Sequence, residues 1–175
     1  MGGEATEVIL VAIDGSQNSL VAAGVGARLA NLLGGKLGLI HVLDIPPLNF
    51  WVGVESRMKE DMRTQAEATL THICERVAAV CDVVPEFYIV EGLPEQEIQR
   101  VATSDAAVVM VVAGRYGIGA EKHSTLSFRR TMGHVAEKLV MQLAVPVLII
   151  PPDIHPSHIC PTMSELTSPG QGRSQ

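Results

Sequence analysis

The chain is poor in aromatic residues, although it is rich in apolar ones. Tryptophan, tyrosine and phenylalanine make up 3% of its 175 residues, whereas 47% of the residues are hydrophobic. Its core must therefore consist mainly of valine, isoleucine, leucine and alanine. The length is sufficient for one domain with a sizeable core.

Long apolar runs, a secretory leader and paired cysteines are also absent from the sequence. No apolar run reaches the roughly 18 residues typical of a membrane helix, and no charged start precedes a long apolar segment. The three cysteines form no Cys-x-x-Cys pair. An odd count without a secretory leader predicts a cytoplasmic protein, with no insertion into a membrane.

A positive net charge is absent as well. The formal charge of −6 argues against general nucleic-acid binding.

Two of the cysteines, Cys74 and Cys81, lie seven residues apart on a predicted helix. We therefore expect them to share one face of that helix and to lie in the core.

Composition divides the chain into three parts. We expect a flexible start over residues 1–7, one α/β domain over residues 8–152, and a disordered tail over residues 153–175. The tail is rich in proline, serine, glycine and threonine and has no apolar period. It contains His155, His158 and Cys160, but structural zinc needs four ligands. We predict no metal site in the protein itself.

Five short stretches are expected to be strands. The first, Val8–Ile13, is a continuous aliphatic run typical of a strand that is buried on both faces of a parallel sheet. The expected strands are Val8–Ile13, Leu37–Leu43, Pro85–Val90, Ala106–Ala113 and Val145–Ile150. Helical patterns separate them. The expected helices are one capped by Ser16 or Asn18 and stopped by Gly34-Gly35, one from about Glu55 to Val80, one from Pro94 to about Thr103, and one opened by Gly133.

Alternation of strands and helices predicts a parallel sheet with right-handed crossovers and helices on both faces. Ligands of such folds bind outside the carboxyl ends of the strands, where the strand order switches. We expect four segments to meet there: Asp14, Val42–Asp44, Glu91-Gly92 and Gly114–Gly119. Backbone amides at glycine turns and helix starts would direct donors at an anion above this edge.

Two features at this edge each have two interpretations. Asp14 either bonds its own turn, as aspartate often does, or accepts hydrogen bonds from a ribose or base. The loop from Arg115 to Arg130 is either a solvated loop or a local anion site. Four of the chain's 13 lysine and arginine residues lie in it: Arg115, Lys122, Arg129 and Arg130.

Several motifs of nucleotide binding and catalysis are missing. The sequence has no GK[ST] phosphate loop, no GxGxxG after the first strand and no GxSxG elbow. Paired acids after the first strand, which a phosphoacceptor domain of this topology would need, are also missing. We find no catalytic dyad, so we predict no catalytic residue and at most weak hydrolysis of a nucleotide.

Residues 8–152 nevertheless resemble the universal stress protein family. The resemblance rests on Val8–Ser16, His41-Val42, Glu91-Gly92, Gly114-x-x-Gly117, Gly133 and Pro146–Ile150. It implies a three-layer α/β/α fold of the adenine nucleotide alpha hydrolase-like type, with a five-stranded parallel sheet in the order 3-2-1-4-5. Members of this family are usually dimeric.

The resemblance also implies a nucleotide site. Asp14 and Val42 match the positions that hold adenosine in nucleotide-binding members. Gly114, Gly117, Gly133, His134 and Val135 match the positions that hold the ribose and phosphates. We expect Arg115 to add a cationic donor.

The sequence departs from the ATP-binding pattern of the family in two places. That pattern has Gly-x-x-Gly, nine further residues, and then glycine followed by serine or threonine. Here fifteen residues separate Gly117 from Gly133, and the next residue is His134. The loop is therefore longer by six residues, and the phosphate-binding hydroxyl is missing.

We expect a stress-response regulatory protein that binds an adenine nucleotide, ATP first among them, with Mg²⁺ accompanying the nucleotide. The alternative is a dimeric interaction module that binds no nucleotide and contacts a partner through its extended loop, residues 118–132. Both interpretations predict a homodimer, because Val145–Ile150 would present an exposed aliphatic edge to another chain.

Overall fold

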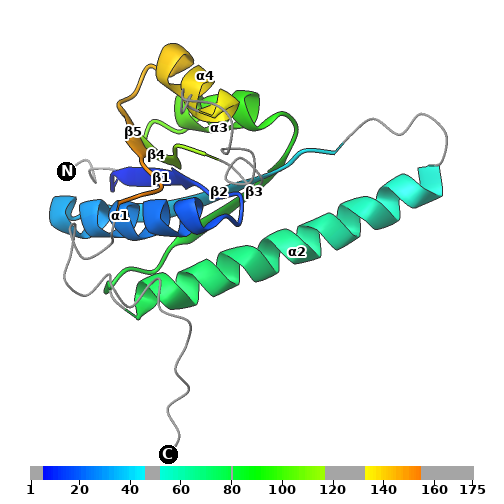
Figure 1. Ribbon diagram of the computed structural model, residues 1–175, viewed down its shortest axis with the longest axis horizontal. Coiled ribbons are helices and arrows are strands. Elements are labelled where there is room, and N and C mark those ends of the chain that lie inside the picture. Colours follow the sequence, from blue (N-terminus) through cyan, green and yellow to red (C-terminus); the bar gives the residue numbers. More distant parts are fainter. Residues whose placement is uncertain (1–5, 46–51, 80, 117–132, 155–175) are drawn as a thin grey trace, which may run out of the picture.

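The computed structural model describes residues 6–45, 52–79, 81–116 and 133–154. Strands and helices alternate along these residues (Figure 1). The elements are β1 (Val8–Ala12), α1 (Gln17–Leu33), β2 (Lys36–Leu43), α2 (Val52–Ala78), β3 (Glu86–Glu91), α3 (Pro94–Ser104), β4 (Val108–Gly114), α4 (His134–Gln142) and β5 (Val147–Ile150).

The five strands form one parallel sheet in the order β3-β2-β1-β4-β5, which confirms the expected topology. The first strand of the chain is the central strand of the sheet. Val8 lies opposite Lys36 on one side and Val108 on the other. All five carboxyl ends meet at the same edge, and the strand order reverses between β1 and β4.

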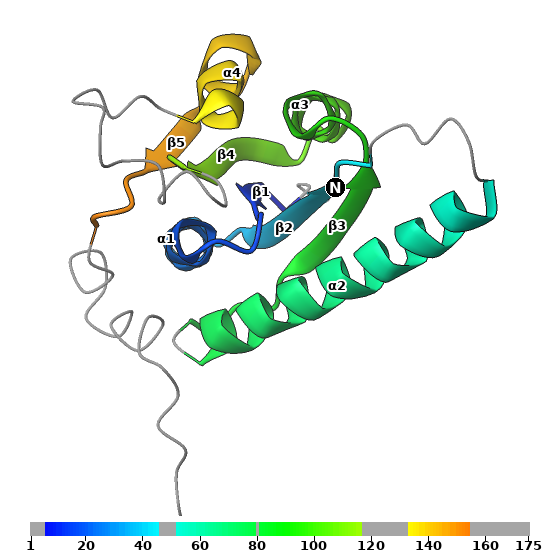
Figure 2. The same ribbon diagram turned by 45° about the vertical axis from the view of Figure 1, so that its right-hand side comes forward.

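Helices cover both faces of the sheet, in three layers (Figures 1 and 2). The helices α1 and α2 lie on one face, and α3 and α4 lie on the other. Side chains of β1 alternate between the two resulting cores: Ile9 and Val11 face α1, whereas Val8 and Leu10 face α3 and α4. This alternation explains why β1 is aliphatic at every position.

Helix α1 packs very closely on the sheet. A Cβ added to Gly26 would lie 2.3 Å from Val11 Cγ2, so only glycine allows this approach. Ser16 caps the helix by accepting a hydrogen bond from the Ser19 amide, and Gly34 ends it at φ 67°, a conformation that favours glycine. Ser16, rather than Asn18, is therefore the cap.

Helix α2 extends beyond the tip of β3 at its start (Figure 2). Helical spacing predicts a buried stripe of Met58, Met62, Ala66, Leu70, Ile73 and Val77. The last four are buried, whereas Met58 and Met62 are only partly buried. The helix ends at Ala78, however, so the prediction that Cys74 and Cys81 share one helical face is wrong. The chain turns after Ala78 and buries Cys81 beside Val77, while Cys74 is only half-buried.

Other differences from the expected elements are confined to their ends. Strand β5 begins at Val147 rather than Val145, because Pro146 has no N–H to donate to a ladder. The Pro146 carbonyl still accepts a hydrogen bond from the Val111 amide at 2.9 Å. The expected metal-ligand types in the tail, His155, His158 and Cys160, lie outside the described residues. No helix within those residues has the length and hydropathy needed to cross a membrane.

Candidate functional site

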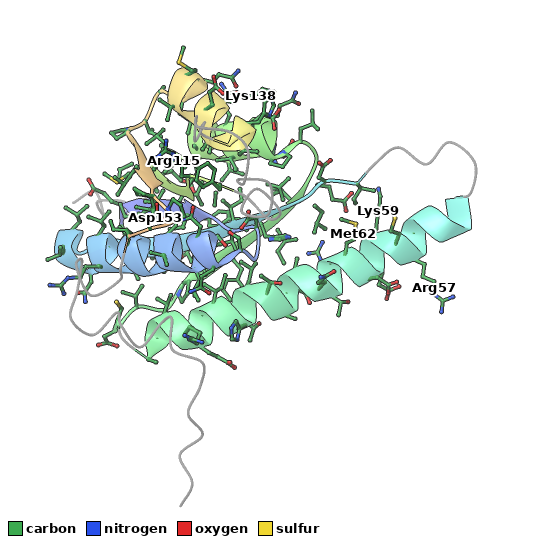
Figure 3. The ribbon with its side chains drawn as sticks, viewed as in Figure 1. Arg57, Lys59, Met62, Arg115, Lys138 and Asp153 are labelled. Carbon is green, nitrogen blue, oxygen red and sulfur yellow. The ribbon has the colours of Figure 1, made fainter. Side chains whose placement is uncertain are left out.

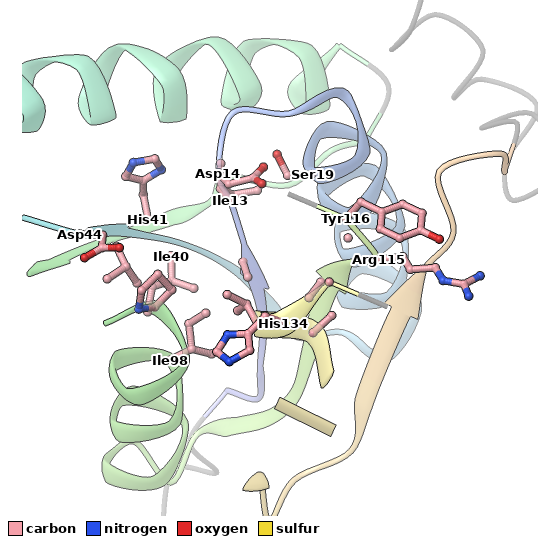
Figure 4. Close-up of a pocket in the computed structure, with 18 of the residues that line it drawn as sticks. Ile13, Asp14, Ser19, Ile40, His41, Asp44, Ile98, Arg115, Tyr116 and His134 are labelled. Carbon is pink, nitrogen blue, oxygen red and sulfur yellow. The ribbon is translucent and has the colours of Figure 1, made fainter. Parts of the chain in front are cut away.

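A cavity of about 500 Å³ opens at the carboxyl edge of the sheet (Figure 4). Its walls come from the ends of β1, β2 and β4, from the starts of α3 and α4, and from Met62 on α2. Figure 3 shows Met62 on the side of α2 that faces the sheet, whereas Arg57 points away. The cavity therefore lies where the strand order switches, the usual place for a ligand in this architecture.

The described residues of the predicted nucleotide site all line this cavity. They are Asp14, Val42, Gly114, Arg115, Gly133, His134 and Val135. Gly117 and the 118–132 loop lie outside the described residues. The fold thus brings together positions that are up to 121 residues apart in the sequence, and their role toward a nucleotide stays a prediction.

Asp14 lies in the turn between β1 and α1. Its Oδ1 accepts a hydrogen bond from the Ser16 amide at 2.9 Å, so the local-turn interpretation of this residue is correct. The same carboxyl group also lines the cavity, close to Ile13 and Ser19 (Figure 4). The turn therefore fixes the direction in which Asp14 presents its oxygens to the cavity.

His41 is a cavity residue that the sequence indicated only as part of a motif. Its ring lies between β2 and α2 (Figure 4). Burial lowers the pKa of this imidazole, against the opposing effects of a hydrogen bond to the Ile13 backbone and the negative charge of Asp14. Its Nδ1 is buried and has no hydrogen-bond partner among the described residues. We therefore expect a neutral ring at pH 7.

An apolar wall lies opposite, on the side of α3. Ile40 and Val42 come from β2, and Pro94 and Ile98 come from α3. Ile98 is almost fully buried, with 3% of its surface exposed. Such a wall suits a flat apolar group, and Asp14 and Asp44 stand at its polar margin.

Backbone groups dominate the opposite end of the cavity. The strand β4 ends at Gly114, and Gly133 precedes the first residue of α4, His134. The Gly133 amide donates to the Arg115 carbonyl at 2.8 Å, which ties the start of α4 to the end of β4. Among the described residues, no side chain caps the first turn of α4. Its first amides therefore face the cavity as donors for an anion.

The side chain of Arg115 does not join this backbone cluster. Its guanidinium carbon lies 5.5 Å from the centre of the Tyr116 ring, and Figure 4 shows the guanidinium extending away from His134, toward the end of β5. Arg115 therefore contributes its backbone to the cavity. The other cations of the predicted anion site, Lys122, Arg129 and Arg130, lie outside the described residues.

An ion pair that the sequence did not indicate joins α3 to α4 beside the cavity. Lys138 Nζ lies 2.5 Å from Glu95 Oε1, and the Glu95 side chain is 9% exposed. The hydrogen bond from Lys138 is the largest cause of a lowered pKa at Glu95, followed by a backbone hydrogen bond. The charges of Lys138 and His134 lower it further.

Asn18 is the second residue that sequence reasoning missed. It was considered only as a helix cap, yet its side chain is buried and contacts the ends of β4 and β5. The only signal in the sequence is an amide in the first turn of an otherwise apolar helix. Its partners, Ile150 and Tyr116, are too distant in the chain to be inferred from spacing.

Comparison with known proteins gives one family. A model of the universal stress protein family matches residues 6–151. No curated protein matches the chain. Universal stress protein UspA from Lactobacillus plantarum has a similar structure, with a TM-score of 0.70 and 19% identity over 85% of this chain and 99% of that one.

Two other similar structures were solved with nucleotides. One is a universal stress protein in complex with cAMP, with a TM-score of 0.57 and 20% identity over 84% of this chain and 98% of that one. The other is a universal stress protein from Archaeoglobus fulgidus in complex with dAMP, with a TM-score of 0.54 and 17% identity over 84% and 99%. At these identities the likeness concerns the fold.

Proposed function

The chain belongs to the universal stress protein family, and on this premise we propose that it binds an adenine nucleotide, ATP first among them. The observation that carries the proposal is the convergence of Asp14, Val42, Gly114, Gly133 and His134 on one cavity. The cAMP and dAMP complexes of structurally similar proteins support adenine-nucleotide binding in general.

The adenosine end of the ligand fits the side of the cavity formed by β1, β2 and α3. Val42, Ile40 and Ile98 offer apolar contact for a base. Asp14, held in its turn by Ser16, is placed to accept hydrogen bonds from ribose hydroxyls. Mg²⁺ would enter with the phosphates of the nucleotide.

The phosphate end fits the backbone cluster between Gly114 and the start of α4. The N-terminus of a helix carries roughly half a positive charge, and its first amides are unpaired donors. His134 stands where the family pattern has serine or threonine. Loss of that hydroxyl removes one neutral hydrogen bond, about 0.5–1.5 kcal/mol, so affinity is lowered by up to about tenfold.

We propose a regulatory role rather than catalysis. The sequence offers no catalytic dyad, so this proposal includes at most weak hydrolysis of the nucleotide. A cytoplasmic location and a part in the stress response belong to this proposal and rest on family membership.

Calorimetry with ATP, ADP and AMP tests the proposal on the full chain. We expect binding by the wild type and tighter binding, by up to about tenfold, by His134→Ser, which restores the hydroxyl. His72→Ser is the matched control, because His72 is exposed on α2 and outside the cavity. If millimolar nucleotide gives neither heat nor a shift in Tm, the proposal is overturned in favour of the interaction module.

A further inference from the structure

Asn18 is a buried amide at the junction of three elements. It lies in the first turn of α1, and 2% of its surface is exposed. Its Nδ2 donates to the carbonyl of Ile150, the last residue of β5, at 3.1 Å. Its Oδ1 accepts from the amide of Tyr116, which follows β4, at 3.2 Å. One side chain therefore contacts the carboxyl ends of two neighbouring strands.

The same two strand ends are joined by backbone bonds. The Ile150 carbonyl accepts a second hydrogen bond from the Arg115 amide at 2.8 Å, and the Arg115 carbonyl accepts from the Gly133 amide at 2.8 Å. A Cβ on Gly114 would lie 3.0 Å from both Cγ and Oδ1 of Asn18. The absence of a side chain at Gly114 thus makes room for the Asn18 amide.

We infer that Asn18 is a positioning residue for the nucleotide site. Its amide holds residues 114–116 in the conformation that directs the turn and the start of α4 toward the ligand's phosphate. Asn18 does not line the cavity, so it acts through Tyr116, Arg115 and Gly133. This inference rests on the proposed function, because the nucleotide is its ligand.

The chemistry of the amide explains why asparagine stands here. An amide offers a donor and an acceptor at one end, and the site uses both. An ionised aspartate would offer only acceptors and would face the Ile150 carbonyl without a proton to share. An alanine would leave the partly buried Tyr116 amide without this partner.

The first test compares Asn18→Ala with Val25→Ala by calorimetry, at a temperature where both variants are folded. Val25 is a matched control because it lies on the same helix, is 5% exposed and does not line the cavity. We expect Asn18→Ala to weaken nucleotide binding by about tenfold or more, which corresponds to roughly 1.4 kcal/mol. Val25→Ala should bind as the wild type does. Equal affinities for the two variants would overturn the inference.

The second test uses Asn18→Asp between about pH 8 and pH 5, with each affinity divided by that of the wild type at the same pH. A protonated carboxyl has one donor and one acceptor, like the amide it replaces. We therefore expect this ratio to rise toward one as the pH falls. A ratio that stays at one throughout would show that Asn18 merely ties α1 to the sheet.

Hydrogen exchange without nucleotide gives a separate readout. The amides of Arg115, Tyr116 and Gly133 should exchange faster in Asn18→Ala than in the wild type, and at the wild-type rate in Val25→Ala. Unchanged exchange in Asn18→Ala would overturn the positioning role. If the wild type binds no nucleotide, the proposed function fails, and the exchange rates still decide whether Asn18 holds the turn.

Discussion

His41 shows how one side chain of the cavity links the ligand site to the stability of the fold. Burial lowers the pKa of the His41 imidazole from its ordinary value of 6.5. At pH values between 6.5 and the lower pKa of the folded state, His41 is protonated in the unfolded chain but not in the folded chain. The unfolded state then gains stability as the pH falls.

We therefore predict that His41 lowers the free energy of unfolding as the pH falls from about 7 through 6.5. The loss levels off below the pKa of the folded state, where both states are protonated. His41→Gln should remove this part of the pH dependence, and His72→Gln, at an exposed position, should keep it. Urea unfolding of the three proteins at several pH values measures how the free energy of unfolding changes with pH. The same pH dependence in the wild type and in His41→Gln would refute the prediction.

At the scale of elements, the Glu95–Lys138 pair links two helices that both border the cavity. Glu95 is buried and Lys138 is partly exposed, so the two ends of the pair are not equivalent. Removing the lysine leaves a buried carboxylate without its main partner, whereas removing the carboxylate leaves an ammonium group that reaches water.

We predict that Lys138→Met lowers the free energy of unfolding at pH 7 by about 1.5–3 kcal/mol, and Glu95→Gln by less. Because the pKa of Glu95 is lowered in the folded state, the contribution is present above the ordinary pKa and is lost as the pH falls through the folded value. Chemical unfolding at pH 7 and at about pH 3 measures both.

The control for this prediction is the Lys36–Glu86 pair, which is 2.7 Å long but about half exposed at both ends. Lys36→Met should cost only about 0.2–1 kcal/mol, since exposed ion pairs contribute little. Equal losses of unfolding free energy in Lys36→Met and Lys138→Met would show that burial of Glu95 does not strengthen the Glu95–Lys138 pair.

The sequence predicts helices and strands well where they depend on residues that are close together in the chain. Stretches rich in apolar residues identify all five strands. The pattern is clearest in β1, because a strand buried on both faces has no polar position to interrupt it. The end of α2 was misplaced, because the burial of Cys81 arises from a turn that packs against the core. The partners of Asn18 and Glu95 could not be predicted, since they lie 132, 98 and 43 residues away.

The same limit applies to the candidate site. Glycines and the strand-end aspartate could be placed at the cavity from the sequence, because carboxyl ends of parallel strands share an edge. Met62 and Ile98 could not, because their place depends on how α2 and α3 lie across the sheet. The direction of the Arg115 side chain could not be predicted either, because it packs over the ring of its neighbour Tyr116.

At the scale of the whole molecule, some of the exposed apolar side chains lie on the edge strand β5 and at the end of α4. Leu148 on the edge strand β5 is 37% exposed, and Val140 and Met141 at the end of α4 are 46% and 79% exposed. An edge strand that carries exposed apolar side chains is a template for pairing with another chain. We propose that two copies of the chain meet there.

We predict that the wild type sediments as a dimer at micromolar concentration and that Leu148→Lys shifts it toward monomer, because a charge would be buried in the contact. Phe87→Lys is the matched control, since Phe87 lies on the opposite edge strand β3 and is 44% exposed. It should leave the dimer intact. A wild-type protein that sediments only as a monomer would contradict the prediction.

The central place of β1 has a consequence for biosynthesis. Val8 pairs with Lys36 on one side and with Val108 on the other, about 100 residues later. At roughly 5–20 residues per second, translation leaves one flank of β1 bare for about 5–20 s after β1 itself is made. Before β3 is made, the nascent chain holds only the β1–β2 pair of strands, which is marginal on its own. After β3 joins β2, the other flank of β1 stays bare until β4 is made. The ribosome-bound chain, rather than the finished protein, is thus the species that most needs a chaperone.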